Sequence, residues 1–266
     1  MAKIKVCVLR TAGTNCDKET AFAFAKVGAA AQLAHINSLV SRKNSLDGYS
    51  ILAFPGGFSY GDDIAAGKIL ANELRCKLTD ELKKFVSAGK LIIGICNGFQ
   101  VLVKSGLLPG GNGLKQEVTL AVNDSAKFED RWVYLKGQGA RGKKQVKCVW
   151  ARNLPEVIYL PVAHGEGKFI TKDKAVLSRL KKNNQVVFLY CDPSGRKALY
   201  PQNPNGSVEG IAGICDETGR ILGLMPHPER HVSFLQHPAR KKNENSTESD
   251  GLIIFRNGVE YAQRYL

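Results

Sequence analysis

The sequence has no long uninterrupted apolar run. A membrane-spanning helix needs roughly 20 mostly apolar residues in a row, so no such helix is predicted. The first ten residues, MAKIKVCVLR, predict a strand rather than a secretory signal. We therefore expect a cytoplasmic protein with an ordinary globular core.

Cysteine pairs of close spacing are also absent. The chain has seven cysteines, an odd number, and none of them form a Cys-x-x-Cys pair. This spacing matches neither a disulfide framework nor a zinc site. We expect free thiols and no metal ion, which leaves each cysteine open to a catalytic role.

Acidic residues are few. Lysine and arginine number 38 against 24 aspartates and glutamates, which gives a formal net charge of +14. Such a surface attracts nucleic acid, anionic substrates or an acidic protein. The densest patches, at residues 141–147, 179–182 and 240–242, have no aromatic residues interleaved as a base-stacking surface requires. We therefore favour solvated loops and a docking face over nucleic-acid binding.

The first hundred residues alternate short apolar runs with longer stretches of helical spacing, which predicts an α/β fold on a parallel sheet. Strands are expected at residues 3–9, 31–36, 50–54 and 91–95, and helices at 17–27 and throughout 63–88. Ligands of open α/β sheets bind at the carboxyl ends of the strands. Function is therefore expected in the loops after residues 9, 54 and 95.

The pattern changes beyond residue 107. Strand-like runs follow one another without clear helices between them, at residues 118–122, 132–135, 157–162 and 186–190. Paired runs at 210–214 and 221–225 precede a last helix at about 251–265. The second half is therefore predicted to be largely antiparallel, and no linker divides the chain, so a single domain over residues 1–266 is expected.

Cys96 lies at a sharp turn between a strand and a helix, in the segment LIIGICNGFQVLVKSG. The pattern G-x-C-x-G, with Gly94 and Gly98, is that of a nucleophile elbow. The positive end of the following helix favours the thiolate, and the N–H of Asn97 is placed to stabilise an oxyanion. A buried core cysteine is the alternative. Cys16 and Cys191 are weaker candidates because they lack the elbow.

A thiol nucleophile needs a histidine base and a carboxylate that orients the histidine. His227 follows a predicted strand in the sequence MPHPER, with Glu229 two residues further on. His164 in VAHGEG has Glu166 at the same spacing and is the rival pair. A His-x-Glu spacing by itself is weak evidence for a catalytic histidine. The assignment of His227 as the base therefore depends on its combination with the elbow.

The motifs GICNGFQ and MPHPER resemble those of the class I, or triad, glutamine amidotransferases. The segments PGGFSYGDD, VAHGEG and NPNGS, in this order, narrow the resemblance to the separate glutaminase subunits of phosphoribosylformylglycinamidine synthases. The resemblance covers residues 15 to the final helix. It implies a flavodoxin-like open sheet, mostly parallel and flanked by helices, with an additional antiparallel portion.

The resemblance also implies residue roles. Cys96 would attack the carboxamide of glutamine to form a thioester, with His227 and Glu229 as base and orienting carboxylate. The N–H groups of Gly57 and Asn97 would form the oxyanion hole. The glutamine pocket would include Gly56, Gln100, His164 and Glu166, the last two of which could instead line a subunit interface.

The partners are implied in the same way. Ammonia would pass to a separate ATP-dependent synthetase subunit that converts formylglycinamide ribonucleotide to its amidine in purine biosynthesis, and a small third subunit is possible. The chain has no G-x-x-x-x-G-K-[ST] loop and no dinucleotide fingerprint of strand, glycine loop and helix, so no cofactor is expected on it. ATP and Mg²⁺ are expected on the synthetase.

Two other readings stay open. The chain could supply ammonia to a different synthetase, or it could be a basic binding protein whose elbow cysteine is incidental. Residues near 136–147, 191–202 and 236–250 resemble surface insertions relative to the family.

Overall fold

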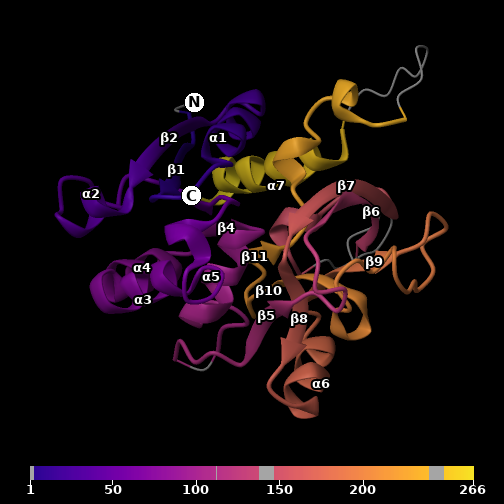
Figure 1. Ribbon diagram of the computed structural model, residues 1–266. Coiled ribbons are helices and arrows are strands. Elements are labelled where there is room, and N and C mark those ends of the chain that lie inside the picture. The colour runs from indigo at the N-terminus through magenta and orange to yellow at the C-terminus, as the bar shows by residue number, and fades with distance from the viewer. Residues whose placement is uncertain (1–2, 112, 138–146, 240–248) are drawn as a thin grey trace.

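The computed structural model describes residues 3–111, 113–137, 147–239 and 249–266 (Figure 1). The strands are β1 (Lys5–Arg10), β2 (Ala30–His35), β3 (Ile51–Phe54), β4 (Leu91–Ile95), β5 (Val118–Val122), β6 (Glu129–Gly137), β7 (Val157–His164), β8 (Glu166–Thr171), β9 (Val186–Cys191), β10 (Ile211–Cys215) and β11 (Ile221–Leu224). The α-helices are α1 (Asp17–Lys26), α2 (Ile36–Val40), α3 (Lys68–Lys77), α4 (Thr79–Ser87), α5 (Asn97–Ser105), α6 (Lys174–Lys182) and α7 (Asp250–Tyr265). Within the described ranges, no helix is long and apolar enough to cross a membrane.

In the described residues, nine strands form one mixed sheet in the order β2-β1-β3-β4-β11-β10-β9-β6-β7. Strands β2, β1, β3, β4 and β11 run parallel, and the sheet continues antiparallel from β10 to β7. A separate antiparallel pair joins β5 to β8. The parallel half has the flavodoxin-like strand order, in which ligands bind where the order reverses beside β1 and β3.

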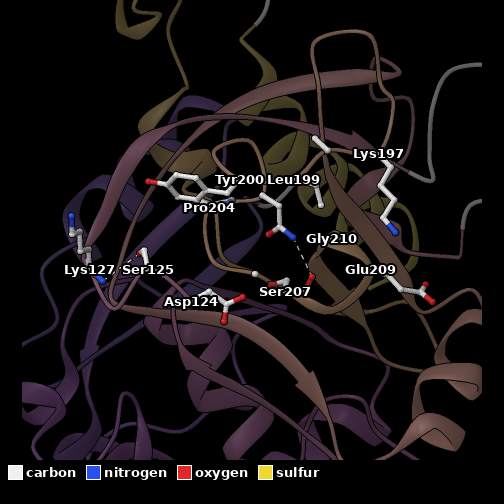
Figure 2. A pocket seen from close by; sticks show the side chains of 13 residues that line it. Asp124, Ser125, Lys127, Lys197, Leu199, Tyr200, Pro204, Ser207, Glu209 and Gly210 are labelled. Atoms are coloured by element: carbon white, nitrogen blue, oxygen red, sulfur yellow. Dashed lines mark hydrogen bonds between the residues drawn. The ribbon is translucent and has the colours of Figure 1, made fainter.

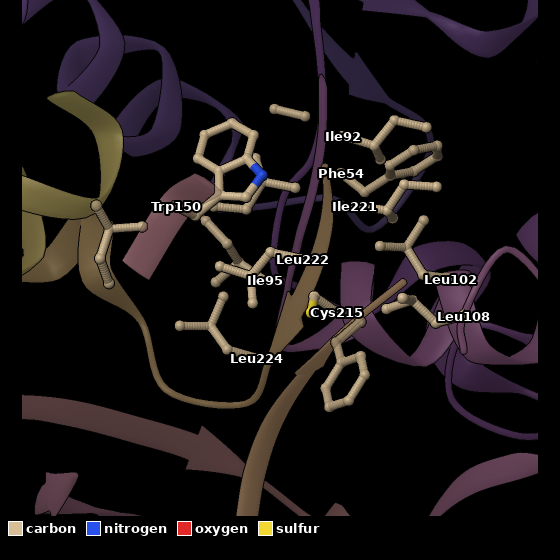
Figure 3. Close-up of a cluster of buried hydrophobic side chains, with 14 of the residues drawn as sticks. Phe54, Ile92, Ile95, Leu102, Leu108, Trp150, Cys215, Ile221, Leu222 and Leu224 are labelled. Carbon is tan, nitrogen blue, oxygen red and sulfur yellow. The ribbon is translucent and has the colours of Figure 1, made fainter. Parts of the chain in front are cut away.

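The central strands carry apolar residues on both faces because both faces are covered. Every residue of β3 and β4 is buried, as expected for parallel strands covered on both sides. Helices α1 and α7 lie on one side of the sheet and α3, α4 and α5 on the other (Figure 1). Figure 3 shows part of this core, where Phe54, Ile92 and Leu102 gather near Ile221. The buried strands hold the loops at their carboxyl ends in fixed positions.

One expectation about helices is wrong, because the second half was predicted to have no clear helices between its strands, and the helical region at 63–88 proves to be two helices. The second half contains α6, in which Val176 and Leu180 are buried and Leu177 packs partly buried against the core, so its periodic signal is short. Asp173 caps this helix by accepting a hydrogen bond from the N–H of Val176 at 2.9 Å. The helical region at 63–88 divides into α3 and α4 at Leu78, whose backbone has φ −130°. Short amphipathic helices are hard to separate from strands by spacing alone.

Candidate active site

Four loops meet at the carboxyl edge of the parallel strands. They follow β1, β3, β4 and β11, which lie side by side in this order in the sheet. The loops after β1 and β3 are joined by backbone pairing of Thr14 with Gly57. The N–H of Cys16 also donates to the carbonyl of Gly56 at 3.2 Å. The predicted location of function therefore corresponds to one connected region of the structure.

Cys96 occupies a strained turn between β4 and α5. Its φ of 51° and ψ of −106° lie in a region that residues with a side chain rarely adopt. Gly98 allows the close approach of α5 to β3, because a Cβ atom there would lie 1.9 Å from the carbonyl oxygen of Phe54. Cys96 as a whole is 5% exposed, and its thiol donates to the carbonyl of Ala163 at 3.6 Å. These features are those of a nucleophile elbow.

The two backbone N–H groups predicted to form an oxyanion hole belong to Gly57, in the loop after β3, and to Asn97, at the start of α5. Asn97 is the first residue of α5, and the N–H groups that open a helix have no acceptor inside it. Gly57 has φ +136°, and a Cβ atom there would lie 2.7 Å from the backbone nitrogen of Asn15. Only glycine therefore permits this loop conformation beside the β1 loop.

His227 and Glu229 form a buried pair. His227 Nδ1 lies 2.6 Å from Glu229 Oε1, and both side chains are almost completely covered. The N–H of His227 donates to the carbonyl of Pro161 at 2.8 Å, which attaches the histidine loop to β7. In the described part of the chain, His227 Nε2 has no hydrogen-bond partner. The pair therefore holds Nδ1 and leaves Nε2 available.

The charges around His227 favour its protonated form. Burial alone would lower its pKa, but the carboxylate of Glu229 and the Cys96 thiol raise the pKa well above its ordinary value. A histidine in this setting can accept the proton of a neighbouring thiol and hold it as an imidazolium.

Gln100 and Glu166 belong to a polar network behind the elbow. Gln100 Nε2 donates to the carbonyl of Glu166 at 2.6 Å, while its Oε1 accepts from Asn97 Nδ2 at 3.0 Å. Glu166 Oε2 accepts from the N–H of Ala66 at 3.3 Å and lies 3.7 Å from Lys104 Nζ. Both side chains therefore connect α5 to the loop before α3 and to β8.

The sequence predicted neither the contacts of the Asn97 side chain nor the place of Lys104 in this network. The Asn97 side chain accepts from the N–H of Ser59 at 3.2 Å and donates to Asp62 Oδ1 at 3.0 Å, so it ties the β3 loop to the elbow. Lys104 is 5% exposed and donates to the carbonyl of Ala66 at 2.5 Å. A lysine inside the apolar run VLVKSG was the available signal for the second.

His164 is built into the core beside the site. Its ring nitrogens face Asn123 Oδ1 at 3.2 Å and Asn205 Nδ2 at 3.5 Å. Burial, with a smaller effect from the charge of His227, lowers the pKa of His164 to about 3. His164 is therefore neutral, and Glu166 does not pair with it as Glu229 pairs with His227.

Of the two weaker candidate cysteines, Cys16 lies at the site and Cys191 does not line it. Cys191 ends β9 and is buried, where burial raises its pKa to about 11. Cys148 is buried and precedes a short 3₁₀ turn. Cys16 lies against His227 and Glu229, closer to the site than its sequence suggested.

A separate pocket of about 720 Å³ lies between the segment 197–210 and the loop of Asp124 to Lys127 (Figure 2). Asp124, Ser125 and Ser207 form one part of its wall, and Leu199 and Tyr200 line another. Leu199 and Tyr200 belong to the segment 191–202, which was predicted to be a surface insertion. None of the residues of the elbow or of the His227–Glu229 pair line this pocket.

Comparison with known proteins identifies the family of the chain. The model of the CobB/CobQ-like glutamine amidotransferase domain matches residues 3–262. The chain is 47% identical to phosphoribosylformylglycinamidine synthase subunit PurQ of Dehalococcoides mccartyi, over 99% of this chain and 100% of the relative. It is 43% identical to the PurQ subunit of Archaeoglobus fulgidus, over 98% of each chain. The chain belongs to the PurQ family of glutamine amidotransferases.

Solved structures agree with this PurQ assignment. PurLQS from Thermotoga maritima matches with a TM-score of 0.74 and 31% identity, over 98% of this chain and 99% of that chain. A glutamine amidotransferase from the same organism is 15% identical with a TM-score of 0.51, over 89% of this chain and 80% of that chain, and shares the fold alone. The PurQ chain therefore has the class I glutamine amidotransferase fold, as its motifs implied.

Proposed function

We propose that this PurQ chain is the glutaminase subunit of a phosphoribosylformylglycinamidine synthase, with Cys96 as its nucleophile. The observation that carries the proposal is the strained elbow of Cys96 beside the buried His227–Glu229 pair. The relatives named as PurQ subunits support the choice of this synthase over other amidotransferases.

The first half of the reaction forms a thioester. Cys96 Sγ attacks the carboxamide carbon of glutamine, and the thiol proton passes to His227 Nε2. Negative charge develops on the carboxamide oxygen, where the N–H groups of Gly57 and Asn97 stabilise it. Ammonia leaves with the proton from His227, while the acyl group remains on sulfur.

The second half releases glutamate. His227 accepts a proton from water, whose oxygen attacks the thioester carbon, and the proton then returns to the Cys96 sulfur as the C–S bond breaks. Glu229 holds Nδ1 of His227 throughout, which fixes the tautomer and stabilises the imidazolium. Glutamine and water thus yield glutamate and ammonia, with the enzyme regenerated.

Gln100 and Glu166 act here by shaping the pocket rather than by chemistry. The oxygen and the nitrogen of the Gln100 side-chain amide are both bonded within the protein, so its effect on glutamine is exerted through the backbone of β8. His164 is neutral and supports the same wall of the pocket. Gly56 permits the close packing of His227 beside the β3 loop.

Ammonia passes to a synthetase subunit that binds ATP and Mg²⁺ and acts on formylglycinamide ribonucleotide. The similarity to PurLQS supports a multi-subunit complex that includes a small third subunit. The seven free cysteines support a reducing compartment, and we expect the chain to work in the cytoplasm.

A glutaminase assay with and without the cognate synthetase, ATP and formylglycinamide ribonucleotide tests this function. Wild type should release glutamate in the complete mixture, and Cys96→Ala should lose at least about 1,000-fold in rate. Glu229→Gln should retain a residual rate, because the tautomer of His227 is no longer fixed while the nucleophile is present.

The same assay distinguishes the alternatives. Glutamate release that depends on Cys96 but does not respond to this synthetase would favour a different amidotransferase. A wild type that releases no glutamate in any mixture, or that is matched by Cys96→Ala, would overturn the proposal.

A further inference from the structure

Cys16 shares a buried cluster with two residues of the active site. One ligand atom each from Cys16, His227 and Glu229 lies within 4.8 Å of the others. Among the residues that the structure describes, this is the one group of three histidine, cysteine or carboxylate side chains with such spacing. The glutaminase reaction derived above has no step for Cys16.

One buried oxygen of this cluster has no role in the chemistry derived above. Glu229 Oε2 and His227 Nε2 are buried and have no hydrogen-bond partner in the described chain. A buried carboxylate oxygen without a partner is costly, and coordination of a cation is one way to satisfy it. Catalysis accounts for the free Nε2 of His227 but leaves Oε2 of Glu229 unexplained.

Gly56 holds two of these side chains next to each other. A Cβ atom at this position would lie 2.7 Å from His227 Cε1 and 3.2 Å from Cys16 Sγ. Since glycine has no such atom, the sulfur and the imidazole ring both pack closely against this part of the β3 loop. The loop therefore keeps the Cys16 thiol beside the His227 ring.

We propose that Cys16, His227 and Glu229 bind a Zn²⁺ ion, or a soft divalent ion of similar preference, and that this binding inhibits the glutaminase. Thiolate, imidazole and carboxylate are the three ligand types that zinc accepts in proteins. The charges of the thiolate and the carboxylate balance the two charges of the ion. Three protein ligands leave a fourth position for water.

The ion must displace a proton and a hydrogen bond. The Cys16 thiol donates to Asn15 Oδ1 at 3.4 Å, and Arg230 Nη2 lies 3.2 Å from its sulfur. On binding, the S–H bond breaks, the S–Zn bond forms and the proton leaves to solvent. Arg230 turns to its other partner, Glu19, whose Oε2 lies 3.0 Å from Arg230 Nε.

The bound ion inhibits the glutaminase whether Nε2 or Nδ1 of His227 coordinates it. Coordination through Nε2 removes the base that Cys96 needs. Coordination through Nδ1 breaks the contact with Glu229 that fixes the tautomer. The inhibitory consequence rests on the proposed function, whereas the binding of the ion does not.

Equilibrium dialysis of the full chain with Zn²⁺ and absorbance with Co²⁺ measure binding directly. Wild type should bind one ion tightly and show thiolate-to-cobalt charge transfer. Cys16→Ser should weaken binding at least about tenfold, because a ligand is lost. Cys76→Ser removes an exposed thiol instead and should bind as wild type does.

The rival site is the Cys96–His227 pair, which could also hold zinc. Cys96→Ala should keep the bound ion and its cobalt spectrum if Cys16 is the ligand. Binding that is lost in Cys96→Ala and kept in Cys16→Ser would overturn the proposal, as would the absence of binding in wild type.

Inhibition is then measured in the complete synthase mixture, with each variant compared with its own rate in chelator. Zinc should inhibit wild type and Cys76→Ser, and the concentration for half inhibition should rise at least about tenfold in Cys16→Ser. Equal inhibition of wild type and Cys16→Ser would contradict the inhibitory role. A chain that binds zinc at Cys16 but has no glutaminase rate would refute the function and leave the metal site standing.

Discussion

At the scale of single residues, the backbone of Cys96 carries strain that its side chain alone does not explain. Its φ of 51° and ψ of −106° are tolerated far more readily by glycine than by any residue with a Cβ atom. Alanine at this position keeps the strain and removes the sulfur. Glycine removes both, and so separates the two contributions.

We therefore predict that Cys96→Gly is more stable than Cys96→Ala. Relief of strain, less the entropy that glycine adds to the unfolded chain, should leave roughly 1 kcal/mol, or a melting temperature roughly 2 to 4 °C higher. Thermal unfolding of both variants measures the difference. At Cys191, whose φ is not positive, the order should reverse, so Cys191→Gly should melt below Cys191→Ala. The same order at both positions would mean that the elbow is not strained.

His164 should make folding sensitive to acid. Burial lowers its pKa to about 3 in the folded chain, whereas an unfolded histidine titrates near 6.5. Between these values the unfolded state binds a proton that the folded state does not. Stability is therefore complete above about pH 6.5 and falls as the pH drops, by up to about 1.4 kcal/mol per pH unit.

Urea unfolding at several pH values between about 4 and about 7 tests this slope. His164→Gln cannot bind the proton, so its free energy of unfolding should fall less steeply with acid than that of wild type, whatever its absolute stability. Parallel slopes would show that folded His164 titrates normally.

How far these residues could be predicted depends on what each does. The elbow cysteine and the His227–Glu229 pair were found because glycines and a short spacing mark them in the sequence. Asn97 was assigned only through its N–H, although its side chain holds Ser59 and Asp62. Such contacts join loops that are far apart in the chain, and no local pattern reveals them.

At the scale of elements, the junction of β4 with α5 depends on Gly98. A Cβ atom there would lie 1.9 Å from the carbonyl oxygen of Phe54, a backbone atom that cannot move without β3. Gly98→Ala should therefore destabilise the chain by about 1 to 3 kcal/mol or more. Its glutaminase rate should fall by about 100-fold, because the displaced helix moves Cys96 and the N–H of Asn97.

Thermal unfolding and glutamate release of Gly98→Ala measure both effects. Gly48→Ala is the matched control, because nothing lies within 4 Å of a Cβ atom there and its φ is not positive. Gly48→Ala should behave as wild type does. A Gly98→Ala variant with wild-type rate and stability would show that α5 does not need this close approach.

Element types were predictable where burial imposes a strong pattern. The fully buried β4 was expected at its observed bounds, since five apolar or small residues between turns leave little choice. Helix α6 was not, because only Val176 and Leu180 of its nine residues are buried. The parallel pairing of β11 with β4 was not foreseen either, since it joins residues more than a hundred positions apart.

At the scale of the whole molecule, the open α/β fold follows from the alternating pattern of the first half, but the distribution of charge does not follow from the sequence. In the patch at 179–182, Arg179 pairs with Glu117 and Lys181 pairs with Glu209. These basic residues are therefore partly neutralised. Most of residues 141–147 and all of 240–242 lie outside the described residues.

The net charge of +14 nevertheless predicts how the chain meets its synthetase partner. If the excess charge serves docking, the partner presents an acidic surface, and attraction between the two accelerates their encounter. Salt screens this attraction over about 10 Å at 0.1 M and about 3 Å at 1 M. The association rate constant should therefore fall at least tenfold between these concentrations, while the dissociation rate constant changes less.

Stopped-flow mixing of labelled subunits measures both constants, and the glutaminase rate of the isolated chain at each salt concentration serves as the control. An association rate constant that does not depend on salt would leave the basic surface without a role in docking, because a screened attraction is the only way in which dispersed charge can act at a distance.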